Sequence, residues 1–164
     1  VDEFDHDGYR NQSLNLRGLT GVTDAGMAHV GRVLGLVGLN LMETRAPGAG
    51  LAALGPLAHL SEFAMAQTQL DDSGMPAMAR LQALATLNLA STRVTDAGLP
   101  PLAGLPRLRA LDLSATQVSD AGLPGLARMA SLTRIDVARS RVTADGVAAA
   151  MAVAGRNPAL RISN

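Results

Sequence analysis

Hydrophobic residues return every 24 positions along most of this chain. The segment from Leu87 to Ala103 recurs, almost letter for letter, as the segment from Leu111 to Ala127. Self-similarity of this length indicates a repeat protein, in which each unit packs on its neighbours and no single central core is needed. The same register holds at Leu39/Leu41, Phe63/Met65 and Ile135/Val137, and Leu14/Leu16 lie one residue out because of an insertion near Arg17 and Gly18.

Each unit predicts a short strand, a turn and a short helix. Leu111 and Leu113 alternate with polar residues at period two, which is typical of a strand with one buried face. Leu123, Leu126 and Ala127 have the i, i+3, i+4 spacing of an apolar helix stripe. A last half unit, with Leu160 and Ile162, predicts a terminal strand, so that residues 14–164 hold six repeats and one further strand.

Four columns of residues recur between strand and helix. A hydroxyl column can bond the turn backbone; a second column, mostly Ser and Thr, can cap the helix; the acids that follow suit the helix dipole. Glycine in every unit predicts that adjacent turns approach too closely for a Cβ. The hydroxyl column is Thr44, Thr68, Thr92, Thr116 and Ser140, and the capping column is Thr23, Asp71, Thr95, Ser119 and Thr143. The acidic column is Asp24, Asp72, Asp96 and Asp120, and the glycine column is Gly26, Gly50, Gly74, Gly98, Gly122 and Gly146.

The units resemble leucine-rich repeats. The pattern around residues 108–127 is similar to the 24-residue bacterial class that includes the GALA-type effectors of plant pathogens, although no F-box module is visible here. The resemblance implies the α/β fold class: a leucine-rich-repeat solenoid, built as a right-handed arc with a parallel concave sheet and short convex helices or 3₁₀ turns. Parallel strands lie ~4.8 Å apart and helices need ~10 Å, which independently favours a sheet on the inside of a curve.

Residues 1–13 lie outside the repeats and carry four acids, so we interpret them as an acidic N-terminal cap or the tail of a preceding segment. The run from Glu3 to Gly8 is like the start of a calcium loop, but its twelfth position would be Leu14, where a bidentate Glu is required. We therefore expect no metal in this segment.

Charge and composition argue against several classes of partner and of functional site. Net charge is zero, which argues against nucleic acid or an anionic membrane as the main partner. No apolar run is long enough to span a membrane, and the absence of Cys excludes disulfides and thiolate sites. All 14 basic residues are Arg, concentrated in the C-terminal half, whereas the acids are concentrated in the N-terminal half.

Motifs for cofactor chemistry are explained by the repeat. The run from Gly48 to Ala53, with Asp71 downstream, matches a dinucleotide fingerprint, but Gly50 and Asp71 belong to the glycine and capping columns. The three His residues occupy unrelated repeat positions. We expect no cofactor, no metal and no catalytic residue.

The candidate binding residues come from stacking the units. Outward positions of successive strands give a polar column on the concave face, in which Asp112 and Asp136 are neighbours and Arg161 follows. Arginines surround this carboxylate pair. The candidate site is Asn40, Asn88, Asp112, Asp136, Arg134, Arg139 and Arg161.

The sequence favours a non-enzymatic protein-binding module that uses this face, as part of a bacterial effector or otherwise. One alternative is a structural or targeting segment of a larger protein. A remote one is a glycoside hydrolase that uses the Asp pair, since paired carboxylates ~5 Å apart can perform retaining hydrolysis. The terminal strand has no capping unit after it, which predicts self-association through that edge or a continuation of the chain. The location is open between the bacterial cytoplasm and secretion into a host cell.

Overall fold

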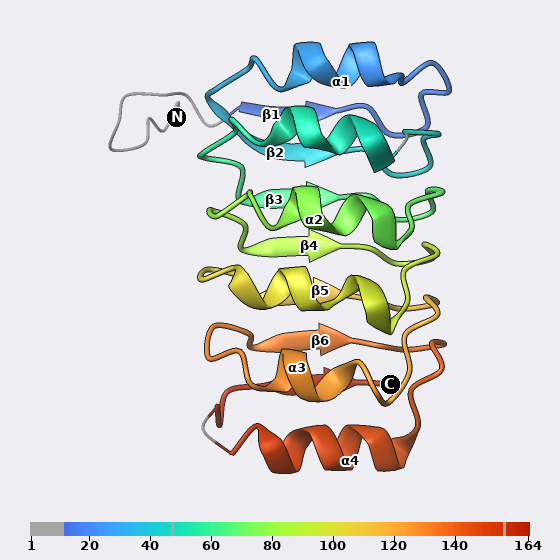
Figure 1. Cartoon of the computed structure of the whole chain (residues 1–164), viewed down its shortest axis with the longest axis vertical. Coiled ribbons are helices and arrows are strands. Elements are labelled where there is room, and N and C mark those ends of the chain that lie inside the picture. The colour runs from blue at the N-terminus through green and yellow to red at the C-terminus, as the bar shows by residue number, and fades with distance from the viewer. Residues whose placement is uncertain (1–11, 47, 156) are drawn as a thin grey trace.

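The residues that the structure describes form one open sheet of seven parallel strands, in the order in which they occur along the chain (Figure 1). This computed structural model describes residues 12–46, 48–155 and 157–164. The strands are β1 (Gln12–Asn15), β2 (Leu36–Asn40), β3 (Glu62–Ala64), β4 (Thr86–Asn88), β5 (Ala110–Asp112), β6 (Arg134–Asp136) and β7 (Arg161–Ser163).

The register of the sheet follows the 24-residue period. Leu39 pairs with Phe63, Phe63 with Leu87, and Leu87 with Leu111. Between β1 and β2 the pairing of Leu14 with Leu39 makes the offset 25, because the first unit carries the additional residue expected near Gly18. The repeat interpretation is therefore confirmed from β1 to β6.

Short helices cover one face of the sheet, and the other face is left open (Figure 1). Pro76 and Pro124, the second residues of α2 and α3, are compatible with the first turn of a helix, and several other segments are 3₁₀ as expected. The α-helices are α1 (Asp24–Val30), α2 (Met75–Met78), α3 (Leu123–Ala127) and α4 (Ala144–Val153), and the 3₁₀ helices are Gly48–Leu54, Asp72–Gly74, Asp96–Gly98 and Pro100–Gly104.

The core is one continuous layer between the sheet and the helices. Two side chains per repeat point into it from the strand and the residue after it, and Leu111 and Leu113 are 1% and 0% exposed. Burial of this aliphatic layer is the main source of stability, since no unit has a core of its own.

The hydroxyl column closes the turns after the strands. The hydroxyls of Thr44, Thr68, Thr92 and Thr116 are buried, and each donates to the carbonyl three residues earlier, over 2.6–2.8 Å. The sequence prediction of a structural role for this column is confirmed. The residue before each hydroxyl lies in the left-handed region, with φ between 53° and 59° from Glu43 to Arg139.

The acidic column links one repeat to the next, a role that sequence reasoning missed when it assigned these residues to the helix dipole. Both oxygens of Asp96 accept hydrogen bonds from Ser119, one from its N–H (2.8 Å) and one from its hydroxyl (2.5 Å). Asp72 bonds Thr95, and Asp120 bonds Thr143, in the same way. We call these three contacts the carboxylate staples.

Aspartate side chains of the preceding repeat lie where a Cβ would fall at several glycines of the column, and at Gly98, Gly122 and Gly146 these aspartates form the staples. A Cβ added at Gly50 would lie 2.6 Å from Oδ1 of Asp24, and one added at Gly122 would lie 2.5 Å from Oδ1 of Asp96. The predicted close approach of adjacent turns is therefore confirmed at these positions, and in the second case the atom approached belongs to a staple.

The Asp120 staple predicts a pH dependence of stability. The N–H and hydroxyl of Thr143 favour the ionised carboxylate, which lowers the pKa of Asp120. Its contribution to stability is complete above the pKa of an unfolded Asp, at about 4, and is lost as the pH falls through the lower folded value. Asp120→Ala should therefore unfold at lower denaturant concentration at neutral pH and lose less stability on acidification than the parent.

Denaturation midpoints measured at a series of pH values test this expectation. Asp145→Ala is the matched control, because Asp145 is an exposed first-turn acid of α4 that makes no staple. Equal acid dependence in the parent and in Asp120→Ala would contradict the assignment.

The register expected for the terminal strand is wrong. Ile162 pairs with Ile135, so Arg161 lies beside Arg134, and Ser163, not Arg161, lies beside Asp136. The offset is 27 because the segment between β6 and β7 is longer: α4 has 10 residues where α3 has five.

The predicted acidic segment, residues 1–13, lies outside the described residues except for Gln12 and Ser13, which belong to β1. The calcium-like run within it lies wholly outside them.

The terminal strand β7 pairs only with β6 within the described part of the chain. Self-association through its free edge stays a prediction, which sedimentation at increasing concentration would test.

Candidate functional site

The open face of the sheet carries two adjoining hollows. The first, of about 410 Å³, extends over β1 to β4, and the second, of about 270 Å³, over β4 to β6. Thr86 and Asn88 line both, so the hollows meet on β4. We refer to this surface, formed by the outward side chains of β1–β6, as the open sheet face.

A polar column crosses the open sheet face, as the sequence predicted. Asn40, Asn88, Asp112 and Asp136 occupy equivalent strand positions. Each uses Oδ1 to accept a hydrogen bond, of 2.9–3.1 Å, from the N–H two residues later. This local turn is a structural reason for Asn or Asp at the position, and it was not foreseen.

The second carboxylate oxygens are available for other contacts. Oδ2 of Asp136 lies 3.8 Å from Nη2 of Arg134, a loose pair whose side chains are 26% and 70% exposed. Asp112 is the Cα partner of Asp136 on the adjacent strand. Its Oδ2 makes no hydrogen bond or ion pair with another residue that the structure describes.

The arginines of the candidate site divide into two groups. Arg134 and Arg161 are neighbours on β6 and β7, and Arg134 lies two positions before Asp136 of the polar column. Arg139 lies in the turn after β6, in the left-handed region, and therefore at the edge of the sheet. The structure brings Arg134 to the carboxylates but places Arg161 beside Arg134.

The centre of the open sheet face is small and apolar. Ala64 lies between Asn40 and Asn88 in the polar column, and Ala66 and Ala90 lie two residues beyond the ends of β3 and β4. A partner side chain can approach the backbone here, in a hollow with polar groups at both ends.

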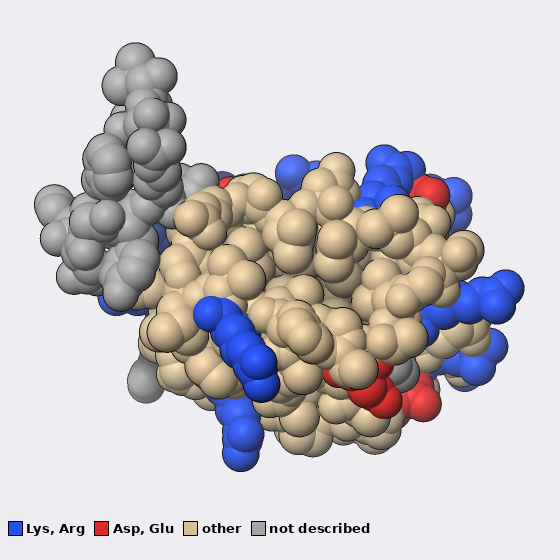
Figure 2. Space-filling model, turned by 90° about the horizontal axis from the view of Figure 1, so that it is seen from above, with Lys and Arg blue, Asp and Glu red and all other residues tan. Residues whose placement is uncertain are grey.

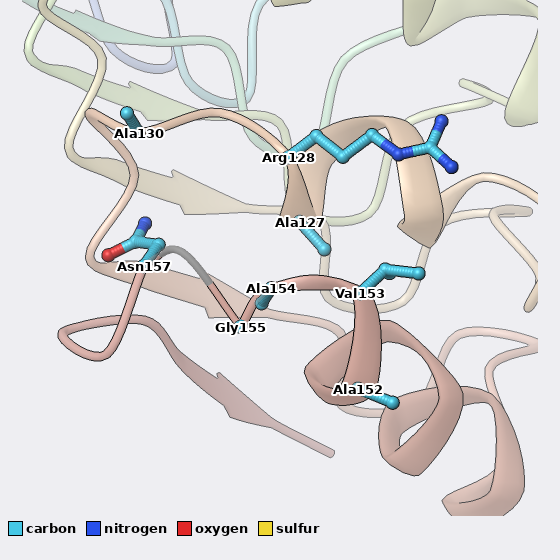
Figure 3. A pocket seen from close by; sticks show the side chains of 8 residues that line it. All are labelled: Ala127, Arg128, Ala130, Ala152, Val153, Ala154, Gly155 and Asn157. Carbon is cyan, nitrogen blue, oxygen red and sulfur yellow. The ribbon is translucent and has the colours of Figure 1, made fainter.

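A further hollow lies on the helical side, between α3 and α4 (Figure 3). It measures about 410 Å³ and is lined mostly by alanines together with Val153 and Arg128. Asn157, also in its lining, is 8% exposed and donates to the carbonyls of Met129 (3.1 Å) and Leu132 (2.5 Å). Sequence reasoning missed this hollow, although the uninterrupted apolar run of α4 was a visible signal.

Solved structures of bacterial proteins share this architecture. An internalin from Listeria monocytogenes matches with a TM-score of 0.69 at 19% identity, over 84% of this chain and 37% of its own. Internalin C2 of the same species matches with 0.60 at 22% identity, over 92% and 69%. A leucine-rich repeat protein of Leptospira interrogans matches with 0.62 at 15% identity, over 84% and 33%. The chain has the leucine-rich repeat fold.

At these identities the comparison establishes the leucine-rich repeat fold and nothing finer. The chain spans about a third of the length of two of these proteins. No protein-family model and no curated protein matches the sequence. The resemblance to GALA-type repeats stays a prediction.

The described residues contain no group of three or more His, Cys, Asp or Glu arranged to hold a metal ion. None of the helices in residues 12–46, 48–155 and 157–164 is both long and apolar enough to cross a membrane.

Proposed function

We propose that this leucine-rich repeat chain is a protein-binding module and that the open sheet face is its binding surface. The observation that carries the proposal is the pair of adjoining hollows, with Asp112 at one end presenting a carboxylate oxygen that has no partner among the described residues. A non-enzymatic role agrees with the expectation from sequence.

The carboxylate pair favours a basic partner group. Adjacent parallel strands lie ~4.8 Å apart, so two like charges at paired positions gain from a cation placed between them. Arg134 supplies part of this charge, but at 3.8 Å and 70% exposure it can be displaced at little cost. An Arg or Lys side chain of the partner fits this place.

The rest of the face favours an extended segment of modest affinity. The hollows follow one another across several strands, and the alanines at their centre admit a backbone or a small side chain. The chain has only 2% aromatic residues, and aromatic anchors usually dominate tight interfaces. We expect dissociation constants in the micromolar range (~1–100 μM).

The two alternative functions are a structural or targeting role in a larger protein and glycoside hydrolysis. The structural or targeting role requires no ligand on the open sheet face. An effector role is compatible with protein binding, because it concerns only where the module acts. Glycoside hydrolysis needs one carboxylic acid and one carboxylate facing a sugar, whereas Asp112 and Asp136 each commit one oxygen to their own turns. A screen with chromogenic glycosides tests the enzymatic alternative.

Replacing both aspartates should weaken binding and leave the fold intact. Asn keeps the turn hydrogen bond through Oδ1, as Asn40 and Asn88 do. Asp112→Asn with Asp136→Asn should therefore cost about 1–1.5 kcal/mol in binding free energy, since only one oxygen of each group is available to a partner. Much of the salt dependence of binding should disappear when these two charges are removed.

The measurement is a calorimetric titration with peptides selected from a random display library on the immobilised chain. Asp71→Asn with Asp145→Asn is the matched control, because both residues are exposed acids at helix starts, away from the open sheet face. Selected peptides that bind the Asp112/Asp136 variant as tightly as the parent would remove the support for this surface.

A further inference from the structure

A second polar column lies outside the open sheet face, in the turns that follow β2 to β6. The third residue of each turn is exposed, and arginine and glutamine alternate along the stack. We call this set the Arg/Gln column: Arg45, Gln69, Arg93, Gln117 and Arg141.

Backbone hydrogen bonds hold this column in register in the C-terminal repeats. The N–H groups of Arg93, Gln117 and Arg141 donate to carbonyls of the preceding repeat over 2.8, 3.0 and 2.9 Å. Each repeat therefore advances by one strand spacing, ~4.8 Å, and successive arginines of the column are anchored ~10 Å apart.

The turns around the column are positively charged. The five turns, at residues 43–46, 67–70, 91–94, 115–118 and 139–142, contain four arginines and a single acid, Glu43. Glu43 is ion-paired with Arg17 at 2.5 Å. Figure 2 shows several basic side chains, with acidic ones beside some of them, on the right-hand side of the molecule, the side on which the strands end in Figure 1.

An acid close to Arg93 already has partners of its own. Asp71 accepts hydrogen bonds from the hydroxyl and N–H of Ser73, and these bonds, with a smaller contribution from the charge of Arg93, lower the pKa of its carboxyl.

The interleaved glutamines add neutral hydrogen-bonding groups. Nη2 of Arg141 donates to Oε1 of Gln117 over 3.3 Å, and the amide N–H groups of Gln117 make no hydrogen bond to another described residue. Amide side chains can both donate and accept, as a peptide backbone does.

We propose that the Arg/Gln column binds an extended acidic segment of a partner protein, with carboxylates at every third residue. An extended chain in the polyproline II conformation has three residues per turn and advances ~3.1 Å per residue, so every third side chain lies on the same side and the carboxylates are spaced close to the ~10 Å between arginines. The glutamines fall opposite the intervening peptide groups. Nucleic acid fits less well, because duplex DNA has a phosphate every ~3.4 Å along each strand and three arginines would neutralise few of them.

This surface is distinct from the open sheet face, and the proposal does not depend on the function proposed there. The column follows the ends of the strands, whereas Asp112 and Asp136 point outward from the strands themselves. The two surfaces also favour partners of opposite charge.

The experiment uses the whole chain and a fluorescent peptide of about twelve residues with the repeating sequence Glu-Pro-Pro, which favours the polyproline II conformation and its spacing. Arg93→Gln with Arg141→Gln is the test variant, because Gln69 and Gln117 show that glutamine is accepted in the same column. Anisotropy titrations at low salt should show affinity falling about tenfold or more. A peptide of the same composition with its glutamates contiguous should bind the parent more weakly.

Arg107→Gln with Arg128→Gln is the control, since it removes the same charge from exposed arginines in the loops before β5 and β6. Equal loss in this control, equal affinity for the two peptides, or tighter binding of a DNA duplex of matched length would each overturn the proposal. The Asp112→Asn/Asp136→Asn variant should bind the acidic peptide as the parent does, so the two surfaces can fail separately.

Discussion

Leu111→Ala is expected to lower the free energy of unfolding by about 2–5 kcal/mol. Leu111 is 1% exposed and pairs in register with Leu87 on one side and Ile135 on the other. Its removal leaves a cavity in the middle of the aliphatic layer, where the neighbouring repeats are fixed by the sheet and cannot close around it.

Chemical denaturation followed by circular dichroism measures this loss. Leu34→Ala is the control, because Leu34 is 53% exposed and its replacement should change stability by less than about 0.5 kcal/mol. If the two variants unfolded at the same denaturant concentration as the parent, the stacked leucine core would be wrong.

Gly122→Ala is expected to destabilise the protein by about 1–3 kcal/mol, although alanine is usually the better residue in a helical backbone. The added Cβ would lie 2.5 Å from Oδ1 of Asp96 and 2.6 Å from Cδ1 of Leu99. Asp96 cannot retreat without losing its two hydrogen bonds to Ser119, so the substitution strains one staple between repeats.

Replacing a neighbouring glycine by alanine is expected to change the stability in the opposite direction. Gly125 lies in the interior of α3, and a Cβ added there meets nothing within 4 Å. Gly125→Ala should therefore stabilise the protein by about 0.5–1 kcal/mol. Thermal melts of both variants test the pair, and a gain in stability for Gly122→Ala would show that the close approach is absent.

The repeat period was sufficient to predict the strands, their order and the buried leucines. Those positions depend on hydrophobic periodicity, which a sequence shows directly. The hydroxyl column could be predicted for the same reason: Thr92 and Thr116 recur in register, and the hydrogen bond that each makes lies within its own turn.

Contacts between units were harder to predict. The carboxylate staples join residues 23 positions apart, and Asp96 alone is equally compatible with a helix dipole. A signal was present, because Gly48 and Asp71, which are also 23 positions apart, replace the acid and the hydroxyl of one staple together. The predicted register of β7 was wrong because the extra residues around α4 displace Ile162 by three positions from the 24-residue period. The spacing of Leu160 and Ile162 alone does not reveal this displacement.

The left-handed turn residues are positions at which the side chain can be replaced without altering the backbone. Glu43, Gln67, Ser91, Ala115 and Arg139 share one backbone conformation but no common side-chain chemistry. From Glu43 to Ala115 their N–H groups donate to the next repeat over 2.8–3.0 Å, so neighbouring backbone imposes the turn whatever the side chain is. Mutational drift and protein engineering can therefore rewrite this edge one repeat at a time, and surface chemistry can diverge while the scaffold stays constant.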